Sequence, residues 1–288
     1  MIKNIPIRKI NVPAKELGVA QNFSIRKVQD MLNGKDMVQE LHRHDFFYVL
    51  VLKNGSGKHE IDFTTYDIGN ASVFFMRPGQ VHQLQLKAES TGFLMEFTTD
   101  FYYPNDVVSH KLLRKVGAKN LCPIDFDGFE KLLSVLNHID REFQEKKEGY
   151  QEVIKSNLSI FFIELVRQRC LNTTLSDKET TYTQERFETF TELLETHITE
   201  HKQASYYAER MHLSLYQLNA ITHTMQGKTT SELINEHIIL EAKRYLLTTS
   251  NQVNQIAYYL GYEDVSYFIR FFKKHTGFSP DAFRQNLR

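Results

Sequence analysis

Residues 256–284 constrain the fold of this chain more than any other part of its sequence. An apolar stretch spaced for one helix is followed by Gly261, by a second helical stretch, by Gly277 and by Pro280. Glycine ends helices because it adopts the left-handed conformation easily, and proline cannot continue a helix. This order predicts two short helices joined by a tight turn, the helix-turn-helix arrangement.

The second of these helices has two chemically different sides. Asp264 is placed as its N-cap, where a carboxylate accepts hydrogen bonds from the free amides of the first turn. At about 100° per residue, one side carries Val265, Phe268, Phe271, Phe272 and His275. The other side carries Ser266, Ile269, Arg270, Lys273 and Lys274. We expect the first side to pack on the preceding helix and the second to remain free.

The same plan occurs a second time, roughly 50 residues earlier, in residues 207–227. In this copy the equivalent free face consists of Tyr216, Gln217, Asn219, Ala220, His223 and Thr224. Between the copies, residues 231–248 have the apolar spacing of a long helix, about 27 Å in length. Such a helix would hold the two copies about one turn of a DNA duplex apart, ~34 Å.

This segment resembles the DNA-binding domain of the AraC/XylS family of bacterial transcription regulators. The resemblance is carried by Ile256-Ala257, Gly261-Tyr262, Ser266-Tyr267-Phe268, Arg270, Phe272-Lys273-Lys274, Gly277, Pro280 and Phe283-Arg284. It implies that Ser266, Tyr267 and Arg270 meet DNA in the second helix. It also implies that Tyr216, Asn219 and Ala220 take the corresponding places in the first.

An α-helix fits the major groove, where arginine pairs with guanine and lysine or serine contacts phosphates. The predicted DNA-binding residues are Tyr216, Gln217, Asn219, Ala220, His223, Ser266, Tyr267, Arg270, Lys273 and Lys274. The family often carries Arg where this chain has Ala220 and Phe where it has Thr222. We therefore expect the first copy to read sequence less strongly than the second.

Composition fits a chain that works in the cytoplasm, and its charge balance implies that binding to DNA would depend on close contacts. The formal net charge is +0, so long-range attraction to DNA is weak and local charge decides. Cys122 and Cys170 are expected to be free thiols of a reducing compartment. No stretch of about 18 apolar residues predicts a membrane span, and the first residues lack the apolar core of a secretory signal.

The sequence divides into two expected domains, which together predict an α+β protein. Residues 171–182 are polar and lack helical apolar spacing, so they are expected to be a linker; a long surface loop within one domain is the alternative. Residues 1–170 would form the first domain and residues 183–288 an all-α domain. The two helix-turn-helix motifs are expected at about 204–227 and about 253–277.

The N-terminal half has the pattern of a β-barrel or sandwich. Short segments rich in β-branched and aromatic residues are expected as strands at 22–31, 46–53, 58–63, 72–76, 82–86 and 92–97. The turns Asn54-Gly55 and Pro78-Gly79 separate some of them, and several short strands in series favour a barrel.

The barrel resembles the cupin-like sensor half found in many members of the same family. The matching residues are His42, His44, Gly55, Gly57, Pro78, Gly79 and His82. Three imidazoles suit a transition metal, but Phe47, Tyr48 and Val49 lie where the carboxylate ligand of cupin enzymes would stand. We therefore predict no metal, no cofactor and no enzymatic activity. A metal-dependent cupin enzyme with a helical accessory module remains the alternative.

The expected role of the barrel is a small-molecule site, apolar with few polar groups. The predicted ligand-binding residues are His42, His44, Phe46, Tyr48, Phe74 and His82, with Phe75 as a further aromatic of the lining. A regulator that needs no ligand, and is controlled by abundance or by a protein partner, is a further alternative.

Two helices are expected after the strands, at 127–147 and 151–170. Asp127 and Glu130 have capping-box spacing at the start of the first helix. Its apolar seam consists of Phe129, Leu132, Leu136, Ile139 and Phe143. Both helices could cover the barrel, or this seam could pair with its twin in a homodimer. The expected partners are promoter DNA, a small-molecule effector, RNA polymerase and a second copy of the chain, with activation as the expected output.

Overall fold

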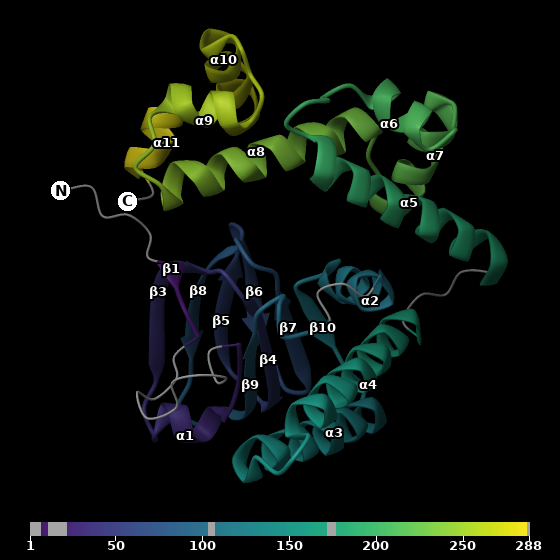
Figure 1. The fold of residues 1–288 in the computed structure, drawn as a ribbon. Helices are drawn as coiled ribbons and strands as arrows, with labels where there is room; N and C mark the ends of the chain where they lie inside the picture. The colour runs from purple at the N-terminus through teal and green to yellow at the C-terminus, as the bar shows by residue number, and fades with distance from the viewer. Residues whose placement is uncertain (1–6, 11–21, 103–106, 172–176, 287–288) are drawn as a thin grey trace. The chain divides into compact units, whose positions relative to one another are not determined.

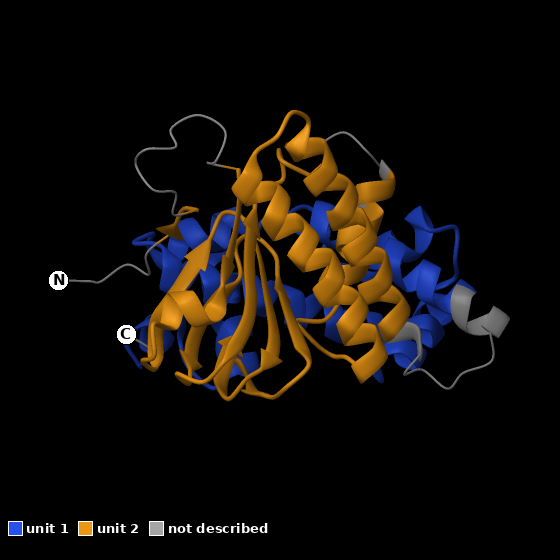
Figure 2. Ribbon diagram, turned by 90° about the horizontal axis from the view of Figure 1, so that it is seen from below, with its two compact units in different colours: residues 1–5, 174–288 blue, residues 6–173 orange. Residues whose placement is uncertain are grey.

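The computed structural model describes residues 7–10, 22–102, 107–171 and 177–286. The chain divides into two compact units, residues 6–173 and residues 174–288 with 1–5 (Figure 2). All described strands lie in the N-terminal unit, residues 6–173, and the described part of the C-terminal unit is helical (Figure 1). The mixed α+β fold predicted from the sequence is confirmed.

Two five-stranded sheets face each other in the N-terminal unit. The first sheet has the order β1 (Ile7–Arg8), β3 (Met37–His44), β8 (Val81–Leu86), β5 (Gly57–Ile61) and β6 (Thr64–Ile68). The second has the order β10 (Leu121–Pro123), β7 (Ser72–Met76), β4 (Phe47–Asn54), β9 (Thr91–Phe97) and β2 (Phe23–Lys27). The β1–β3 pair is parallel, and the other described pairs are antiparallel.

The second sheet is buried on both faces, because the side chains along its strands point alternately into two hydrophobic cores. In β4, Tyr48 and Leu50 belong to the core between the sheets. Phe47 and Val49 belong to a second core, shared with the helices that cover the outer face. Neighbouring side chains of a strand point to opposite faces, so one apolar run fills both cores.

Among the described residues of this unit, four helices follow or interrupt the strands. They are α1 (Val28–Leu32), α2 (Val107–Gly117), α3 (Phe126–Glu145) and α4 (Tyr150–Leu171). The first turn of α3 is capped by Asp125, which accepts a hydrogen bond of 2.7 Å from the Gly128 amide, so the predicted cap at Asp127 is wrong.

The apolar seam of α3 is used within the chain. Phe129, Leu132, Leu136 and Ile139 are all buried in the core that α3 and α4 form with the second sheet, and Phe143 packs against that core. The alternative in which both helices cover the barrel is therefore correct. The seam therefore lies inside the unit and is not exposed for pairing with its twin.

Several sequence-based element predictions need correction. The strand expected at 22–31 ends at Lys27, and α1 begins at Val28. No strand was predicted at β1, β3, β6 or β10, and no helix was predicted at α2. In β3 the cause is physical: its polar sequence is broken by a bulge between Gln39 and His42, so it lacks a regular alternation.

The C-terminal unit is built around α8 (Thr230–Thr248), the long helix predicted between the two motifs (Figure 1). The first module contains α6 (Ala204–Arg210) and α7 (Leu215–Gln226), and the second contains α9 (Val253–Tyr259), α10 (Val265–Thr276) and α11 (Pro280–Asn286). Helix α5 (Asp177–His197) precedes them and starts inside the segment expected as a linker. Of that segment, residues 172–176 lie outside the described residues.

Both modules turn in the same way. His212 and Gly261 have positive φ angles of 56° and 72°, directly after α6 and α9 end. Behind each turn the same backbone hydrogen bond of 2.9 Å forms, from Leu213 to Ala208 and from Tyr262 to Ala257. None of the described helices has the length and apolarity needed to cross a membrane.

The turn of the second module also contacts the loop that precedes α6. A Cβ atom added to Gly261 would lie 1.6 Å from the carbonyl oxygen of Thr199. The Lys202 ammonium donates to the carbonyl oxygens of Thr199 (3.0 Å) and Gly261 (2.8 Å), and it lies over the Tyr262 ring. This contact joins the two modules in addition to α8.

Gly261→Ala should therefore destabilise the C-terminal unit more than Gly277→Ala. Both glycines have positive φ, and alanine in that conformation costs about 1–2 kcal/mol. Only Gly261 has a backbone atom in the way; at Gly277 nothing lies within 4 Å of the added Cβ. Urea unfolding followed by helical circular dichroism measures both variants. Equal losses of unfolding free energy in the two variants would show that the contact between Gly261 and Thr199 is not tight.

Candidate functional site

The free face of α10 is the most positively charged exposed helix surface that the sequence pointed to. Ser266, Tyr267, Arg270, Lys273 and Lys274 are all exposed and share one side of the helix. Phe268 and Phe272, on the opposite side, are 0 % exposed. Their burial fixes which side of α10 remains accessible, so the predicted separation of the two faces is confirmed for these residues.

Local hydrogen bonds define both ends of α10. The Asp264 carboxylate accepts from the amides of Ser266 (2.7 Å) and Tyr267 (3.1 Å), as predicted for the N-cap. Gly277 takes the left-handed conformation and closes the helix. The Arg270 guanidinium lies 3.9 Å from Asp264 at an exposed position, where an ion pair is weak. Arg270 can therefore exchange this contact for a partner.

The corresponding face of α7 carries less charge. Tyr216, Ala220 and His223 are exposed, and Ala220 stands where α10 has Arg270. The side-chain oxygen of Gln217 accepts a hydrogen bond of 2.9 Å from the Ser214 amide as part of a capping box. Gln217 therefore has a structural role at the start of α7, whatever it does on DNA.

Asn219 also has a partner within the chain. Its side-chain oxygen accepts a hydrogen bond of 2.9 Å from the backbone amide of Thr230, which is 0 % exposed. Thr222 is buried at the same joint and lies 3.4 Å from the Thr230 hydroxyl. This joint holds the end of the first module against the start of α8.

In the second module the same joint is apolar. Ile269, Phe272 and Pro280 stand at the positions equivalent to Asn219, Thr222 and Thr230. Proline has no backbone N–H, so no acceptor is needed at the position of Ile269. The difference between the copies indicates that Asn219 is present to satisfy the Thr230 amide.

The second region of interest is the inner face of the first sheet, where four histidines meet. His42 lies directly opposite His82 in the β3–β8 register, and His44 follows two residues later on the same face. The bulge after Gln39 inserts one extra residue into β3, which reverses the alternation and turns His42 and His44 inward. His59 reaches the same cluster from β5.

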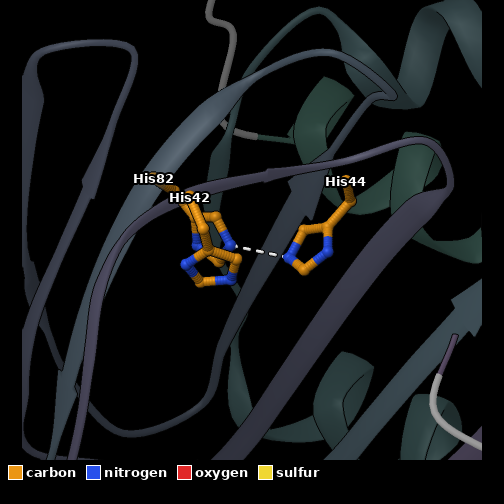
Figure 3. Close-up of side chains that lie close together, drawn as sticks. All are labelled: His42, His44 and His82. Atoms are coloured by element: carbon orange, nitrogen blue, oxygen red, sulfur yellow. Dashed lines mark hydrogen bonds between the residues drawn. The ribbon is translucent and has the colours of Figure 1, made fainter. Parts of the chain in front are cut away.

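Hydrogen bonds link these imidazoles. The Nε2 atoms of His44 and His82 lie 2.8 Å apart (Figure 3). His82 Nδ1 lies 2.9 Å from His59 Nε2. His42 Nδ1 donates to the Glu40 carbonyl oxygen at 2.7 Å. Burial lowers the pKa of His42 to about 4 and the pKa values of His44 and His59 to about 3. Burial also lowers the pKa of His82 well below its usual range, so the cluster is uncharged at neutral pH.

The predicted aromatic residues divide between the two cores. Phe46, Tyr48 and Phe74 lie between the sheets, close to the histidines. The ring of Tyr48 is 5.3 Å from that of His44 and 5.2 Å from that of His82. Phe75 faces the helices instead, so its expected place in the barrel lining is wrong. Strand alternation is the reason, because Phe74 and Phe75 are adjacent in β7.

Two further features of the interior were not found from the sequence. His59 completes the imidazole cluster. In the sequence it stands between two charged residues, Lys58 and Glu60, and only the strand register shows that it faces the interior. Glu96 is buried and accepts a 2.8 Å hydrogen bond from Arg26. Burial raises the pKa of Glu96, and the positive charge of Arg26 opposes this shift.

Cys122 is a buried free thiol, as predicted.

Two domain families match this chain, one in each unit. Residues 207–286 match a helix-turn-helix domain, and residues 32–101 match the AraC-like ligand binding domain.

Similar proteins of known name were found along most of the chain. The HTH-type transcriptional activator RhaS of Escherichia fergusonii is 25% identical over 252 residues, covering 85% of this chain and 87% of that protein. RhaS of Pectobacterium carotovorum is 24% identical and covers 84% and 86%. Among solved structures, ToxT of Vibrio cholerae is 17% identical with a TM-score of 0.44, covering 92% of this chain and 98% of ToxT.

Asn219→Ala should lower stability through the joint with α8. The change leaves the buried Thr230 amide without an acceptor, which costs about 1–3 kcal/mol of unfolding free energy. The double variant Asn219→Ile with Thr230→Pro imitates the second module and should recover most of this loss, because proline removes the orphan donor. Thermal unfolding measures all three chains. A double variant no more stable than Asn219→Ala would refute the structural role.

Proposed function

The chain belongs to the AraC family of transcription regulators, and on this premise we propose that it activates transcription by binding promoter DNA with α7 and α10. The relatives named above are activators, which supports activation as the output. A regulator of this kind works where the chromosome is, in the cytoplasm, with RNA polymerase as its partner. The proposal includes no enzymatic step.

The exposed face of α10 is the observation that carries the proposal. It combines one guanidinium, two ammonium groups, a hydroxyl and a phenol on a helix whose other side is anchored by Phe268 and Phe272. A helix of this width enters the major groove, where Arg270 can pair with guanine O6 and N7. Lys273 and Lys274, one turn further on, are suited to backbone phosphates, which position a protein without reading sequence.

We assign unequal roles to the two modules. The face of α7 offers Tyr216, Ala220 and His223, which suit apolar contact with a thymine methyl group and hydrogen bonds to the backbone. It carries no arginine or lysine on the predicted contact face. Most of the sequence reading and most of the phosphate attraction are therefore assigned to α10, while α7 sets position.

The barrel interior is proposed as the ligand site of the regulator. His42, His44, His82 and Tyr48 bring polar atoms to one region of the interior, and Phe46 and Phe74 supply apolar walls. This is the mixture expected of a small-ligand site. A ligand bound at this site would control DNA binding. The match of residues 32–101 to the AraC-like ligand binding domain supports this role.

We also propose a homodimer, through α4 rather than through the buried seam of α3. Ile160 and Ile163 are exposed on α4, on a stripe that continues to Arg167. A second copy packed on this stripe would cover both isoleucines. Two copies would also double the number of DNA-contacting helices, which compensates for the net charge of +0.

Arg270→Ala should weaken binding to the chain's own operator by about 1–3 kcal/mol and relax preference at one base pair, because a base contact is lost.

Lys273→Ala should weaken binding to all sequences alike and reduce the slope of log affinity against log salt by about 0.9, because a phosphate contact is lost. Fluorescence anisotropy on operator and random duplexes, at several salt concentrations, separates the two effects. An equal loss on operator and random DNA for Arg270→Ala would contradict base reading.

Ile160→Glu and Ile163→Glu should each convert a dimer into a monomer, because a buried unpaired carboxylate is costly at an interface. Val38→Glu is the matched control, since Val38 is an exposed apolar residue on β3. Light scattering after size exclusion gives the mass of each variant. A dimer that survives Ile160→Glu and Ile163→Glu at the same concentration would place the interface elsewhere.

A further inference from the structure

We propose that the barrel binds a divalent transition-metal ion of the zinc class through the Nε2 atoms of His42, His44 and His82, with His59 as a positioning residue. The inference deepens the proposed ligand site by naming its chemistry. It reverses the expectation of no metal that followed from the missing carboxylate, because three converging imidazoles form a sufficient donor set without one.

The backbone brings the three rings together before any side chain is considered. Strand pairing sets His42 opposite His82, and the bulge in β3 places His44 on the same inward face. One ligand atom from each of the three residues lies within 4.8 Å of the others, and all three side chains are buried. The three rings converge on a common region (Figure 3).

Hydrogen bonds on the far side of two of the three rings, His42 and His82, leave one nitrogen of each for the ion. His42 Nδ1 donates to the Glu40 carbonyl, so its Nε2 carries a lone pair. That Nε2 is buried and has no hydrogen-bond partner among the described residues. His82 Nδ1 is held by His59, which leaves His82 Nε2 facing His44 Nε2.

This pattern is that of a supported metal site. Metal-binding histidines usually donate their other N–H to a carbonyl, a carboxylate or another acceptor, which fixes the tautomer and the ring orientation. His42 has such a partner in Glu40, and His82 has one in His59. An apolar ligand would leave the lone pair of His42 Nε2 without a partner, whereas an ion uses it.

The distances require only small ring movements. Zinc binds imidazole nitrogen at about 2.0–2.1 Å, so nitrogen atoms of a tetrahedral site are about 3.3 Å apart. The 2.8 Å separation of His44 and His82 must open slightly, and the longest separation, within 4.8 Å, must close. Neutral imidazoles suit zinc, copper, iron and nickel, and they do not suit magnesium or calcium.

The test uses the full chain without an affinity tag, stripped with a chelator and titrated with Co²⁺ as a spectroscopic probe. We expect one equivalent per chain, the visible absorption of a four-coordinate site with three nitrogen ligands, displacement by Zn²⁺ and no response to Mg²⁺. His42→Gln and His44→Gln should each abolish this absorption. His59→Gln should keep the spectrum but weaken Co²⁺ affinity about 10–100-fold, as expected for a residue that orients a ligand.

His138→Gln is the matched control, because His138 lies on α3 and pairs with Asn157 away from the cluster. Circular dichroism of the metal-free chains checks that the variants fold. If a ligand variant does not fold, the wild-type spectrum and stoichiometry together with His59→Gln still decide the matter. Uptake that is unchanged in His42→Gln, or no uptake by the wild type, would overturn the metal site. Operator binding is measured on the same samples, so a failed metal site and a failed DNA-binding proposal are distinguished.

Discussion

The N-terminal unit depends on strand β4, which has to satisfy two hydrophobic cores at once. Its residues from Phe47 to Leu52 are all buried, and they alternate between the space inside the barrel and the space under α3 and α4. Burying one such aromatic or aliphatic side chain contributes about 1.5–3 kcal/mol. A shift of one residue would exchange the two faces, so the register is strongly fixed.

The polar interior of the barrel follows from this constraint. Because the second sheet supplies apolar side chains to both cores, the first sheet can carry histidines on its inner face without loss of the fold. The bulge in β3 turns His42 and His44 inward, and it lies directly before the pair formed by His42 and His82. Bulges commonly re-aim side chains near functional sites, and this one creates the cluster.

The C-terminal unit shows how two copies of one motif solve the same problem differently. In the first copy the joint with the following helix is a hydrogen bond between Asn219 and Thr230, and in the second it is the apolar contact of Phe272 with Phe283. The second solution leaves the whole outer face of α10 free for charged residues. The first solution uses the side chain of Asn219 within the chain, although its position on α7 predicts a contact with DNA.

The sequence by itself determined the helix-turn-helix pair, the caps at Asp264 and Gly277, the buried face of α10 and most strands, because these depend on local spacing and backbone preference. Tertiary structure alone decided which residues lie opposite each other. The bulge before His42, the arrival of His59 from another strand, the burial of the α3 seam and the partner of Asn219 all depend on contacts between residues distant in the chain. Periodicity shows which side of an element is apolar, but only the packed structure shows what covers it.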